Sequence, residues 1–278
     1  TMSMPFYVAP EQMMKDRAAC ARKGIARGRS LVAVACSDGI LLVAENPSRT
    51  LFKIGEIYDR VAFAGAGRYN EFDSLRIAGV RHADIKGYQF SRDDVEARSL
   101  ANAYAQMLGQ IFTHEMKPLE VEILVAEVGT DPAGDRLFHI LYDGTVVDES
   151  RFTVLGGDSE TLAARLRDSL AGDTDLRSAI AVAVTALAGP DRTLSSDRLE
   201  VATLERGAPR RCFRRWTESE LNDVLANGDA AVAPNGDADV APNGAADSPT
   251  EPGPDPAAAP AVEPAAEPGG SSVEPHAS

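Results

Sequence analysis

Few residues in this sequence have types and spacings that could perform chemistry. The three cysteines, Cys20, Cys36 and Cys212, lie far apart, and Cys36 falls within an apolar run. Such cysteines are typical of reduced thiols in a cytoplasmic protein and do not indicate a disulfide framework. The four histidines show no ligand-like spacing with cysteines or carboxylates, so we expect no metal site. They are His82, His114, His139 and His276. Nothing else in the chain indicates a cofactor.

Two glycine-rich turns could bind an anion through their backbone N–H groups, because each precedes an expected helix. They are Gly65-Ala66-Gly67 and Gly156-Gly157. We prefer the simpler interpretation for both, a close turn that takes the chain from a strand into a helix. The sequence therefore offers no compact catalytic motif, and its function has to be inferred from the elements that hold these residues.

The stretch from Gly28 to Gly67 organises the expected fold. Its first two apolar runs are joined by a tight turn at Asp38-Gly39, since glycine adopts φ > 0 at no steric cost. Continuous apolar strands of this kind indicate a sheet that is buried on both faces. The expected strands in this stretch are 30–36, 40–44, 52–54 and 57–64.

Strand-like runs and helical periodicity alternate in groups along the rest of the chain. Further strands are expected at 121–126, 137–142, 145–147, 152–155, 199–204 and 211–216. Helices are expected at 11–23, 68–83, 91–117, 158–170, 176–187 and 217–225. Grouped strands and paired helices predict an α+β fold. We expect a four-layer αββα sandwich, in which two antiparallel sheets are stacked and helices cover each outer face.

The expected helix at 11–23 has an inner face of small apolar residues. Such a face suits packing against another helix in an assembly better than a deep core position. The inner face of the helix at 11–23 consists of Met14, Ala18, Ala21 and Ile25. Pro10 precedes this helix and fits its first turn.

In the third expected helix, at 91–117, Ser91 or Asp93 is the expected N-cap. The inner face of the helix at 91–117 consists of Leu100, Tyr104, Met107, Leu108 and Ile111.

The net charge of −14 is concentrated in the C-terminal part of the chain. Twelve of the 42 acidic residues follow Trp216, where there is no lysine or arginine, so the first 216 residues carry 30 acidic and 28 basic side chains. This nearly neutral body lacks the basic excess of a nucleic-acid surface. No apolar run approaches the roughly 18 residues of a membrane span, and the N-terminus lacks a signal-peptide pattern. We therefore expect a cytoplasmic protein with no nucleic-acid or membrane partner.

The chain is expected to have three parts. Residues 1–9 show no amphipathic period and are interpreted as an extended, mobile arm, and residues 10–227 form the folded domain. Residues 228–278 form an acidic tail rich in Pro, Ala and Gly, in which the octapeptide 232–239 recurs at 240–247 with one change. The tail cannot bury enough apolar area to offset its chain entropy, so we expect it to be disordered. A solvated tail is preferred, and a regulatory role is the alternative.

Several motifs, taken in order and spacing, resemble one family. The chain resembles the α-type subunits of the 20S proteasome in their actinobacterial form, over about residues 5–216. This resemblance implies the αββα fold of the N-terminal-nucleophile hydrolases. The motifs are Lys23-Gly-Ile-Ala-Arg-Gly-Arg-Ser30, Val43-Ala-Glu-Asn-Pro-Ser-Arg49, Lys53-Ile54, Ile57-Tyr-Asp-Arg60, Gly65-Ala-Gly-Arg-Tyr-Asn-Glu-Phe-Asp73, Leu100-Ala-Asn-Ala-Tyr-Ala-Gln106 and Ala126-Glu-Val128.

The resemblance implies that the chain has no catalytic residue. Catalytic relatives use an N-terminal threonine, whose hydroxyl attacks and whose free amine acts as the base. This sequence begins with Thr1, but its first core strand is expected only near Ser30. The position matching the nucleophile holds Arg29 or Ser30, inside a continuous chain with no free amine. Thr1 is expected to have become first when an initiator methionine was removed. The chain would then be a non-catalytic subunit of a threonine-type endopeptidase complex.

Lys53 has two interpretations. It is either a solvated lysine between strands or, as the resemblance implies, part of a pocket between neighbouring α subunits. There it would pair with the C-terminal carboxylate of a regulatory ATPase through a charge-assisted hydrogen bond. Gly28 resembles a glycine of the same pocket, where the missing side chain would let the backbone of the ATPase tail approach.

The resemblance also implies that the N-terminal arm is a gate. Pro10 resembles the proline of a reverse turn that hinges the gate, and copies of the arm could plug an entry pore. A frayed terminus is the alternative. The arm lacks the Tyr-Asp-Arg cluster of archaeal and eukaryotic gates, so their open-gate hydrogen bonds are not implied. The gate residues are Met4, Pro5, Phe6, Tyr7, Val8 and Pro10.

Together these features predict a structural and regulatory function. The chain would form a homo-heptameric α ring at each end of a 28-subunit α7β7β7α7 core, template the proteasome β subunits and restrict the entry of protein substrates. It would also dock a hexameric AAA ATPase activator, and the lineage implies substrates tagged with the ubiquitin-like protein Pup. Two alternatives stay open. One is a self-contained N-terminal-nucleophile peptidase or amidohydrolase processed near Ser30, and the other is a ring-forming binding protein without a proteolytic partner.

Overall fold

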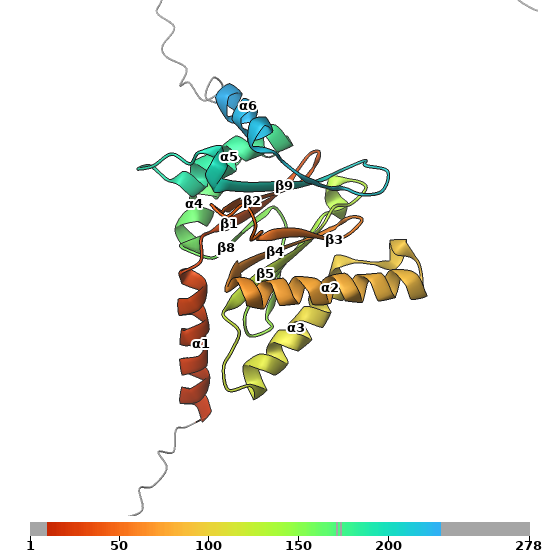
Figure 1. The fold of residues 1–278 in the computed structure, drawn as a ribbon, viewed down its shortest axis with the longest axis vertical. Coiled ribbons are helices and arrows are strands. Elements are labelled where there is room, and N and C mark those ends of the chain that lie inside the picture. Colours follow the sequence, from red (N-terminus) through yellow and green to blue (C-terminus); the bar gives the residue numbers. More distant parts are fainter. Residues whose placement is uncertain (1–9, 171, 173, 229–278) are drawn as a thin grey trace, which may run out of the picture. The chain divides into compact units, whose positions relative to one another are not determined.

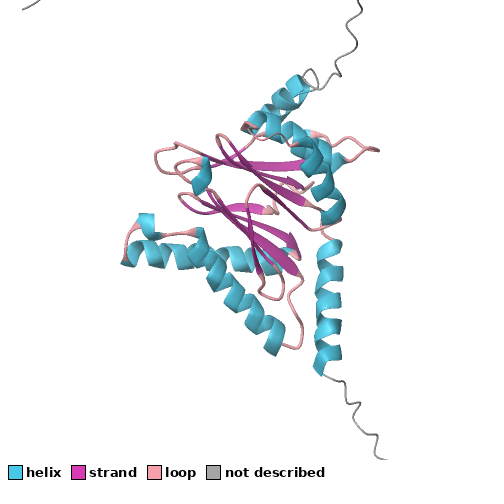
Figure 2. Cartoon of the chain, turned by 180° about the vertical axis from the view of Figure 1, so that it is seen from behind, coloured by secondary structure: helices cyan, strands magenta, loops and turns pink. Residues whose placement is uncertain are grey.

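A computed structural model describes residues 10–170, 172 and 174–228. By its internal contacts the chain divides into two units, residues 1–233 and 234–278, and every described residue belongs to the first. The first unit consists of two five-stranded antiparallel sheets with helices outside each (Figures 1 and 2). The predicted four-layer αββα sandwich is therefore confirmed.

The first sheet has the strand order β10-β9-β2-β1-β8, and the second has the order β3-β4-β5-β6-β7. Every strand pairing in both sheets is antiparallel. Strands of the first sheet are β1 (Leu31–Cys36), β2 (Gly39–Glu45), β8 (Phe152–Leu155), β9 (Leu199–Glu205) and β10 (Phe213–Arg215). Strands of the second are β3 (Ile54–Tyr58), β4 (Val61–Gly67), β5 (Val121–Glu127), β6 (Arg136–Ile140) and β7 (Val146–Glu149).

Helices cover the outer faces of both sheets. The α-helices of the described residues are α1 (Pro10–Ala26), α2 (Tyr69–Gln89), α3 (Ala97–His114), α4 (Ser159–Ser169), α5 (Leu176–Ala188) and α6 (Glu218–Gly228). α2 and α3 share an apolar cluster with the second sheet, and α4, α5 and α6 share one with the first. α1 belongs to neither layer and runs along one side of the sandwich (Figures 1 and 2). No helix in the described part of the chain is long and apolar enough to cross a membrane.

The alternation of side chains along β4 explains how one strand serves two cores. Val61 and Phe63 point outward into the cluster formed with α2 and α3. Ala62, Ala64 and Ala66 point inward, where they pack against the first sheet. Successive residues of a strand face opposite sides, so a continuous apolar run has to be covered twice. The prediction that these strands are buried on both faces is confirmed.

The start of the third helix was predicted wrongly. Ser91 does form a capping box with Asp94, but this box closes a single 3₁₀ turn at Arg92–Asp94. The chain then extends through Val95, and α3 begins at Ala97. The Ala97 N–H donates to Oε2 of Glu127 at 2.8 Å, so a carboxylate from β5 caps the helix. A cap supplied by a distant strand leaves no local signal in the sequence.

Other boundaries also differ from the sequence prediction. α2 continues past residue 83 to Gln89, and its last turns leave the core, since Ile85 and Tyr88 are exposed. The last turns of α2 have no apolar periodicity, because no core covers them, so the sequence did not predict them. The strand predicted at 52–54 contributes only Ile54 to β3, and the strand predicted at 57–64 is divided between β3 and β4, which pair through an irregularity between Glu56 and Tyr58.

The inner face predicted for α1 is only partly buried. Ala21 and Ile25 are buried against Tyr142, with Ala18 and Phe112 beside them. Met14 is exposed. The side of α1 that contacts the rest of the chain is therefore short. Two side-chain contacts add to it, because Arg17 Nη1 donates to the carbonyl of Phe112 and Arg22 Nε donates to the Tyr142 hydroxyl at 3.0 Å.

Candidate functional site

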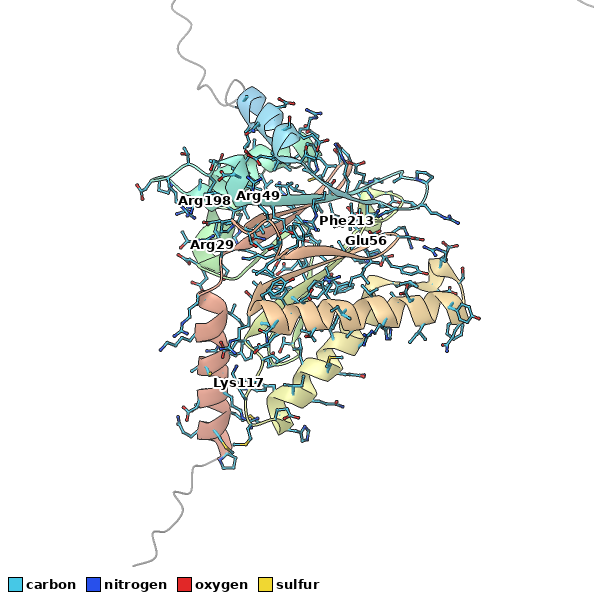
Figure 3. The ribbon with its side chains drawn as sticks, viewed as in Figure 1. Arg29, Arg49, Glu56, Lys117, Arg198 and Phe213 are labelled. Carbon is cyan, nitrogen blue, oxygen red and sulfur yellow. The ribbon has the colours of Figure 1, made fainter. Side chains whose placement is uncertain are left out.

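Lys53 connects the start of β3 to the linker between α1 and β1. Its ammonium nitrogen donates to the carbonyl oxygen of Arg29 at 2.5 Å, although the two residues are 24 positions apart. Arg29 lies where α1 passes into the sheets (Figure 3). Gly28 is the preceding residue in that linker. The structure therefore brings together the two predicted pocket residues, Lys53 and Gly28, around one short piece of backbone.

The charge of Lys53 is poorly compensated in this chain. The pKa of its ammonium is lowered from 10.5 to about 8, chiefly by burial and also by the nearby Arg29 guanidinium, while Glu200 and Glu45 oppose the shift. Within the described ranges Lys53 forms no ion pair with a carboxylate. A half-buried ammonium whose pKa is lowered by burial gains from any carboxylate that reaches it.

Gly28 has a structural reason of its own to lack a side chain. Its N–H donates to the carbonyl of Ile25 at 2.8 Å, which closes the C-terminal end of α1. A Cβ at this position would lie 3.0 Å from the Ile25 carbonyl oxygen and 3.1 Å from the Gly67 nitrogen. Both neighbours are backbone atoms, so a side chain here would require the backbone to shift by a few tenths of an ångström. Close packing within the chain therefore favours glycine at this position.

Ser30, one of the two positions that the resemblance matches to the nucleophile, has no basic partner among the described residues. Its hydroxyl donates to the carbonyl of Gly156 at 3.4 Å, and its own carbonyl accepts from Glu45 N–H at 3.2 Å. A serine nucleophile needs a base within hydrogen-bonding reach. Ser30 is also bonded through its nitrogen to Arg29, so it has no free amine. This geometry supports no acyl-transfer chemistry at Ser30.

Glu45 links Arg29 to the end of α5. Its carboxylate pairs with Arg29 Nε at 3.7 Å and with Arg192 Nη2 at 2.9 Å. A cavity of about 450 Å³ lies beside this cluster, and Ser30 and Arg165 also line it. Because acidic and basic groups share the lining, the cavity shows no preference for a ligand of one charge.

Gly156-Gly157 is a close turn, as preferred from the sequence, whereas Gly65-Ala66-Gly67 is not a turn but the end of β4, where all three residues pair with β5. Gly156 and Gly157 have φ of +70° and +55°, a conformation that favours glycine, and they lead from β8 into α4. The Gly156 N–H donates to the Glu122 carboxylate, so this amide is already occupied. Gly67 has φ of +105° and precedes α2.

A buried polar group connects the two sheets near this turn. His139 Nε2 lies 3.1 Å from Oε2 of Glu122, and His139 Nδ1 lies 3.4 Å from Oγ1 of Thr153. His139 and Glu122 belong to the second sheet and Thr153 to the first. Sequence reasoning considered His139 only as a metal ligand. No cluster of three or more possible ligands is placed to hold a metal ion in the part of the chain that the structure describes.

The sequence analysis also missed Glu200. This residue of β9 is 6% exposed, and its carboxylate accepts four hydrogen bonds from the segment around Lys53 and from Arg215. The available signal was a lone carboxylate inside the apolar run Leu199–Leu204. A charged group is buried in a sheet only where several donors compensate it.

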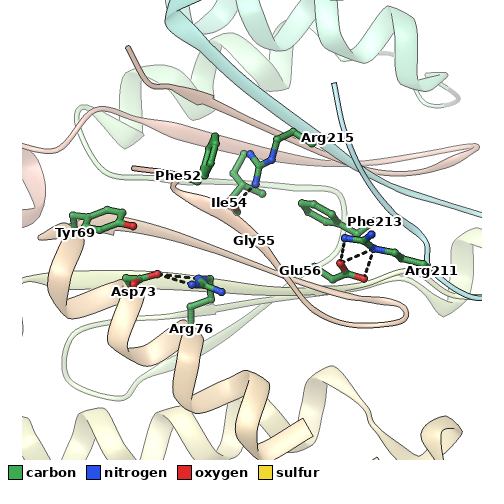
Figure 4. Close-up of a pocket in the computed structure, with 10 residues that line it drawn as sticks. All are labelled: Phe52, Ile54, Gly55, Glu56, Tyr69, Asp73, Arg76, Arg211, Phe213 and Arg215. Carbon is green, nitrogen blue, oxygen red and sulfur yellow. Dashed lines mark hydrogen bonds and ion pairs between the residues drawn. The ribbon is translucent and has the colours of Figure 1, made fainter. Parts of the chain in front are cut away.

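A second and larger cavity lies on the other side of β3. It measures about 570 Å³ and is bounded by β3, α2 and β10 (Figure 4). Four of its charged side chains are paired with one another, Arg76 with Asp73 and Arg211 with Glu56, and the fifth, Arg215, is paired with Glu200. Internal pairing leaves no uncompensated charge in this cavity for a ligand, in contrast to Lys53.

Comparison with known proteins identifies the family. The proteasome subunit family matches residues 25–204, which include β1 to β4, Lys53 and Ser30. The chain belongs to the proteasome subunit family. Its similarity to α subunits extends over most of the chain.

Three relatives illustrate this similarity, and each is a proteasome subunit alpha. The protein of Acidimicrobium ferrooxidans is 58% identical over 226 residues, covering 81% of this chain and 97% of the relative. That of Thermobifida fusca is 57% identical over 227 residues, covering 81% and 91%. That of Xylanimonas cellulosilytica is 55% identical over 225 residues, covering 77% and 92%.

Proteasome α subunits are non-catalytic components of the 20S core, and this member is one of them. The environment of Ser30 agrees with that role. Of the predicted gate residues, Met4, Pro5, Phe6, Tyr7 and Val8 lie outside the described residues. Pro10 is the first residue of α1, as its position in the sequence predicted.

Proposed function

We propose that this α subunit forms a homo-heptameric ring at each end of a 28-subunit core and docks a hexameric AAA ATPase. The ring would template the β subunits and control the entry of protein substrates, including proteins tagged with Pup, in the cytoplasm. Family membership and the antiparallel sandwich support a subunit of the core. The ring size, the activator and the tagged substrates are inferred from the resemblance to actinobacterial α subunits.

The observation that carries activator docking is the uncompensated ammonium of Lys53. This group is half-buried, its pKa is lowered to about 8, and within the described residues its hydrogen bond goes to the neutral carbonyl of Arg29. A C-terminal carboxylate would supply the missing negative charge. Hydrogen bonds between ionised groups are short and roughly twice as strong as neutral ones. The tail of an ATPase would thus bind where the α1–β1 linker meets β3.

We further propose that the arm at residues 1–9 gates the entry pore. The arm leads directly into α1, whose first residue is Pro10. α1 is anchored near its other end by Ala21 and Ile25, while Met14 remains exposed. A helix held at one end can transmit a displacement between the docking residues at its C-terminal end and the arm that precedes it.

The docking proposal is tested in the assembled core, co-expressed with the β subunit of the same genome. The probe is a synthetic peptide with the C-terminal sequence of that genome's proteasomal ATPase, and the same peptide with a C-terminal amide is its control. The peptide acid should bind and accelerate hydrolysis of a fluorogenic substrate, whereas the amide should not. Lys53→Ala should abolish the effect. Lys86→Ala, in the last turn of α2, removes a lysine of the same kind and should change nothing. Equal binding of acid and amide, or a normal response in Lys53→Ala, would contradict the proposal.

A further inference from the structure

The Glu200 carboxylate binds the backbone of Lys53 and of the next residue, Ile54. Its Oε2 accepts from the backbone N–H of Lys53 at 2.8 Å, and its Oε1 accepts from the backbone N–H of Ile54 at 3.0 Å. One carboxylate thus binds two consecutive amides. Glu200 belongs to β9 of the first sheet, whereas Ile54 begins β3 of the second. The Lys53 backbone is therefore fixed against the opposite sheet.

Asn46 fixes the other end of the connection that leads to Lys53. Its side-chain nitrogen donates to Oε2 of Glu200 at 2.7 Å and to the Leu51 carbonyl at 2.8 Å. Its side-chain oxygen accepts from the Ser48 N–H at 3.0 Å. Asn46 is itself buried. The loop between β2 and β3 is consequently organised around the Glu200 carboxylate.

Arg215 completes the arrangement from β10. Its guanidinium donates to Oε1 of Glu200 at 2.6 Å and to the carbonyl of Ile54 at 2.7 Å. The guanidinium carbon lies 4.2 Å from the centre of the Phe52 ring, a distance at which a cation is attracted to the face of an aromatic ring. Figure 4 shows Arg215 between Phe52 and Phe213 with its bond to Ile54. Both residues that flank Lys53 are thus held by the side chain that compensates Glu200.

We propose that Glu200, supported by Arg215, is a positioning residue for activator docking, because it fixes the Lys53 backbone and supplies a negative charge behind the ammonium. This inference rests on the proposed docking at Lys53. It adds a residue on β9 that is 147 positions from Lys53 in sequence and does not itself meet the activator. The geometry directs the ammonium toward the α1–β1 linker, where the incoming carboxylate binds.

The charge of Glu200 has a separate effect from its hydrogen bonds. Glu200 raises the pKa of Lys53 and so opposes the lowering caused by burial. The other charged groups that act on Lys53 are Arg29, from the α1–β1 linker, which lowers its pKa, and Glu45, from β2, which raises it. When Glu200 is neutral, less opposes the lowering of the Lys53 pKa by burial and by Arg29. The Lys53 pKa then falls, and the cationic form that binds a carboxylate is lost at a lower pH.

The test compares Glu200→Gln with Glu205→Gln in the assembled core. Glu205 lies on the same strand and pairs with Arg214 at the surface, so it is a matched control for the change of shape and charge. The probe is the ATPase-tail peptide with a free carboxylate, and its binding is measured from pH 6.5 to 9.5. Glu200→Gln should weaken binding about five- to tenfold at pH 7, because lost charge-assisted hydrogen bonds typically cost that much. It should also move the midpoint of the pH dependence to lower pH, while Glu205→Gln behaves as wild type.

The outcomes separate this inference from the proposed function. If Lys53→Ala binds the peptide normally, docking at Lys53 is wrong whatever Glu200 does. If Lys53→Ala fails to bind and Glu200→Gln matches wild type in affinity, the positioning role is wrong. Weakened binding with an unchanged pH midpoint would also overturn it, because a merely structural defect does not move the titration of Lys53.

A second variant keeps the inference testable if Glu200→Gln does not assemble. Asn46→Ala removes one of the four donors to Glu200 and leaves its charge in place. It should weaken binding of the peptide acid about two- to threefold, as expected for one modest hydrogen bond, with the pH midpoint unchanged. Unaltered affinity in Asn46→Ala would count against the inference.

Discussion

The ammonium of Lys53 donates a hydrogen bond to the carbonyl oxygen of Arg29, at 2.5 Å, and not to a carboxylate. This single contact ties the start of β3 to the residue that precedes Ser30 and β1. It uses one of the three N–H donors of the ammonium. The same short linker carries Gly28 and Ser30. In this chain the lysine therefore meets a continuous peptide, and its charge stays available to an incoming anion.

Binding of an ATPase tail should weaken as pH rises through the pKa of Lys53. The folded-state pKa of about 8 means that the ammonium is cationic below pH 8 and neutral above it. From pH 7 to pH 9 the charged fraction falls from about nine-tenths to about one-tenth, so affinity should fall about tenfold. The measurement is a titration of the labelled peptide acid into the assembled core at each pH.

Lys53→Arg provides the control for this pH dependence. Arginine keeps its charge throughout the range, since its pKa exceeds 12. Any binding that Lys53→Arg retains should therefore be constant between pH 7 and pH 9. A decline of similar size in this variant would assign the titration to another group.

Gly28→Ala should destabilise the chain by about 1–3 kcal/mol, the usual cost of overpacking a close contact. The added methyl group would lie 3.0 Å from the Ile25 carbonyl oxygen and 3.1 Å from the Gly67 nitrogen. Gly172→Ala is the matched control, because a Cβ there has nothing within 4 Å. Urea denaturation of both variants measures the difference. Equal midpoints would show that the α1–β1 linker tolerates a side chain.

His139→Ala should also lower the free energy of unfolding, by about 1–3 kcal/mol. The substitution leaves the buried Glu122 carboxylate and the Thr153 hydroxyl without their shared partner, and such losses typically cost this amount. His114→Ala, on the exposed end of α3, is the comparison. If His114→Ala lowered the free energy of unfolding as much as His139→Ala, the contact of His139 with Glu122 and Thr153 would not be specifically stabilising.

The sequence predicted the layers well because their signal is repeated and local. Along β4, Val61 and Phe63 alternate with alanines, and every residue of the run is apolar. A strand with this pattern exposes neither of its faces to solvent. Helices must therefore cover one face of its sheet, and a second sheet must cover the other. The helix expected at 217–225 also has a local cause, since the two partners of its capping box, Thr217 and Glu220, lie within one turn.

The sequence did not predict elements whose cause lies far away in the chain. The start of α3 depends on Glu127, which follows it by 30 residues. The anchoring of Lys53 depends on Glu200 and on Arg215, which no spacing relates to it. Lys53 and Gly28 were selected through the resemblance to α subunits, and only the fold brings them to the same linker. A single sequence contains the partners of such contacts but not their pairing.

The most direct test of the account is native mass spectrometry of the chain co-expressed with its β-type partner, together with peptide hydrolysis by full-length and arm-deleted forms. We predict a complex of 28 subunits, with two seven-membered α rings, that hydrolyses peptides faster once residues 1–9 are removed. Monomers of this chain that hydrolyse peptides alone would contradict the account, because they would show an active site in a chain assigned to gating and docking.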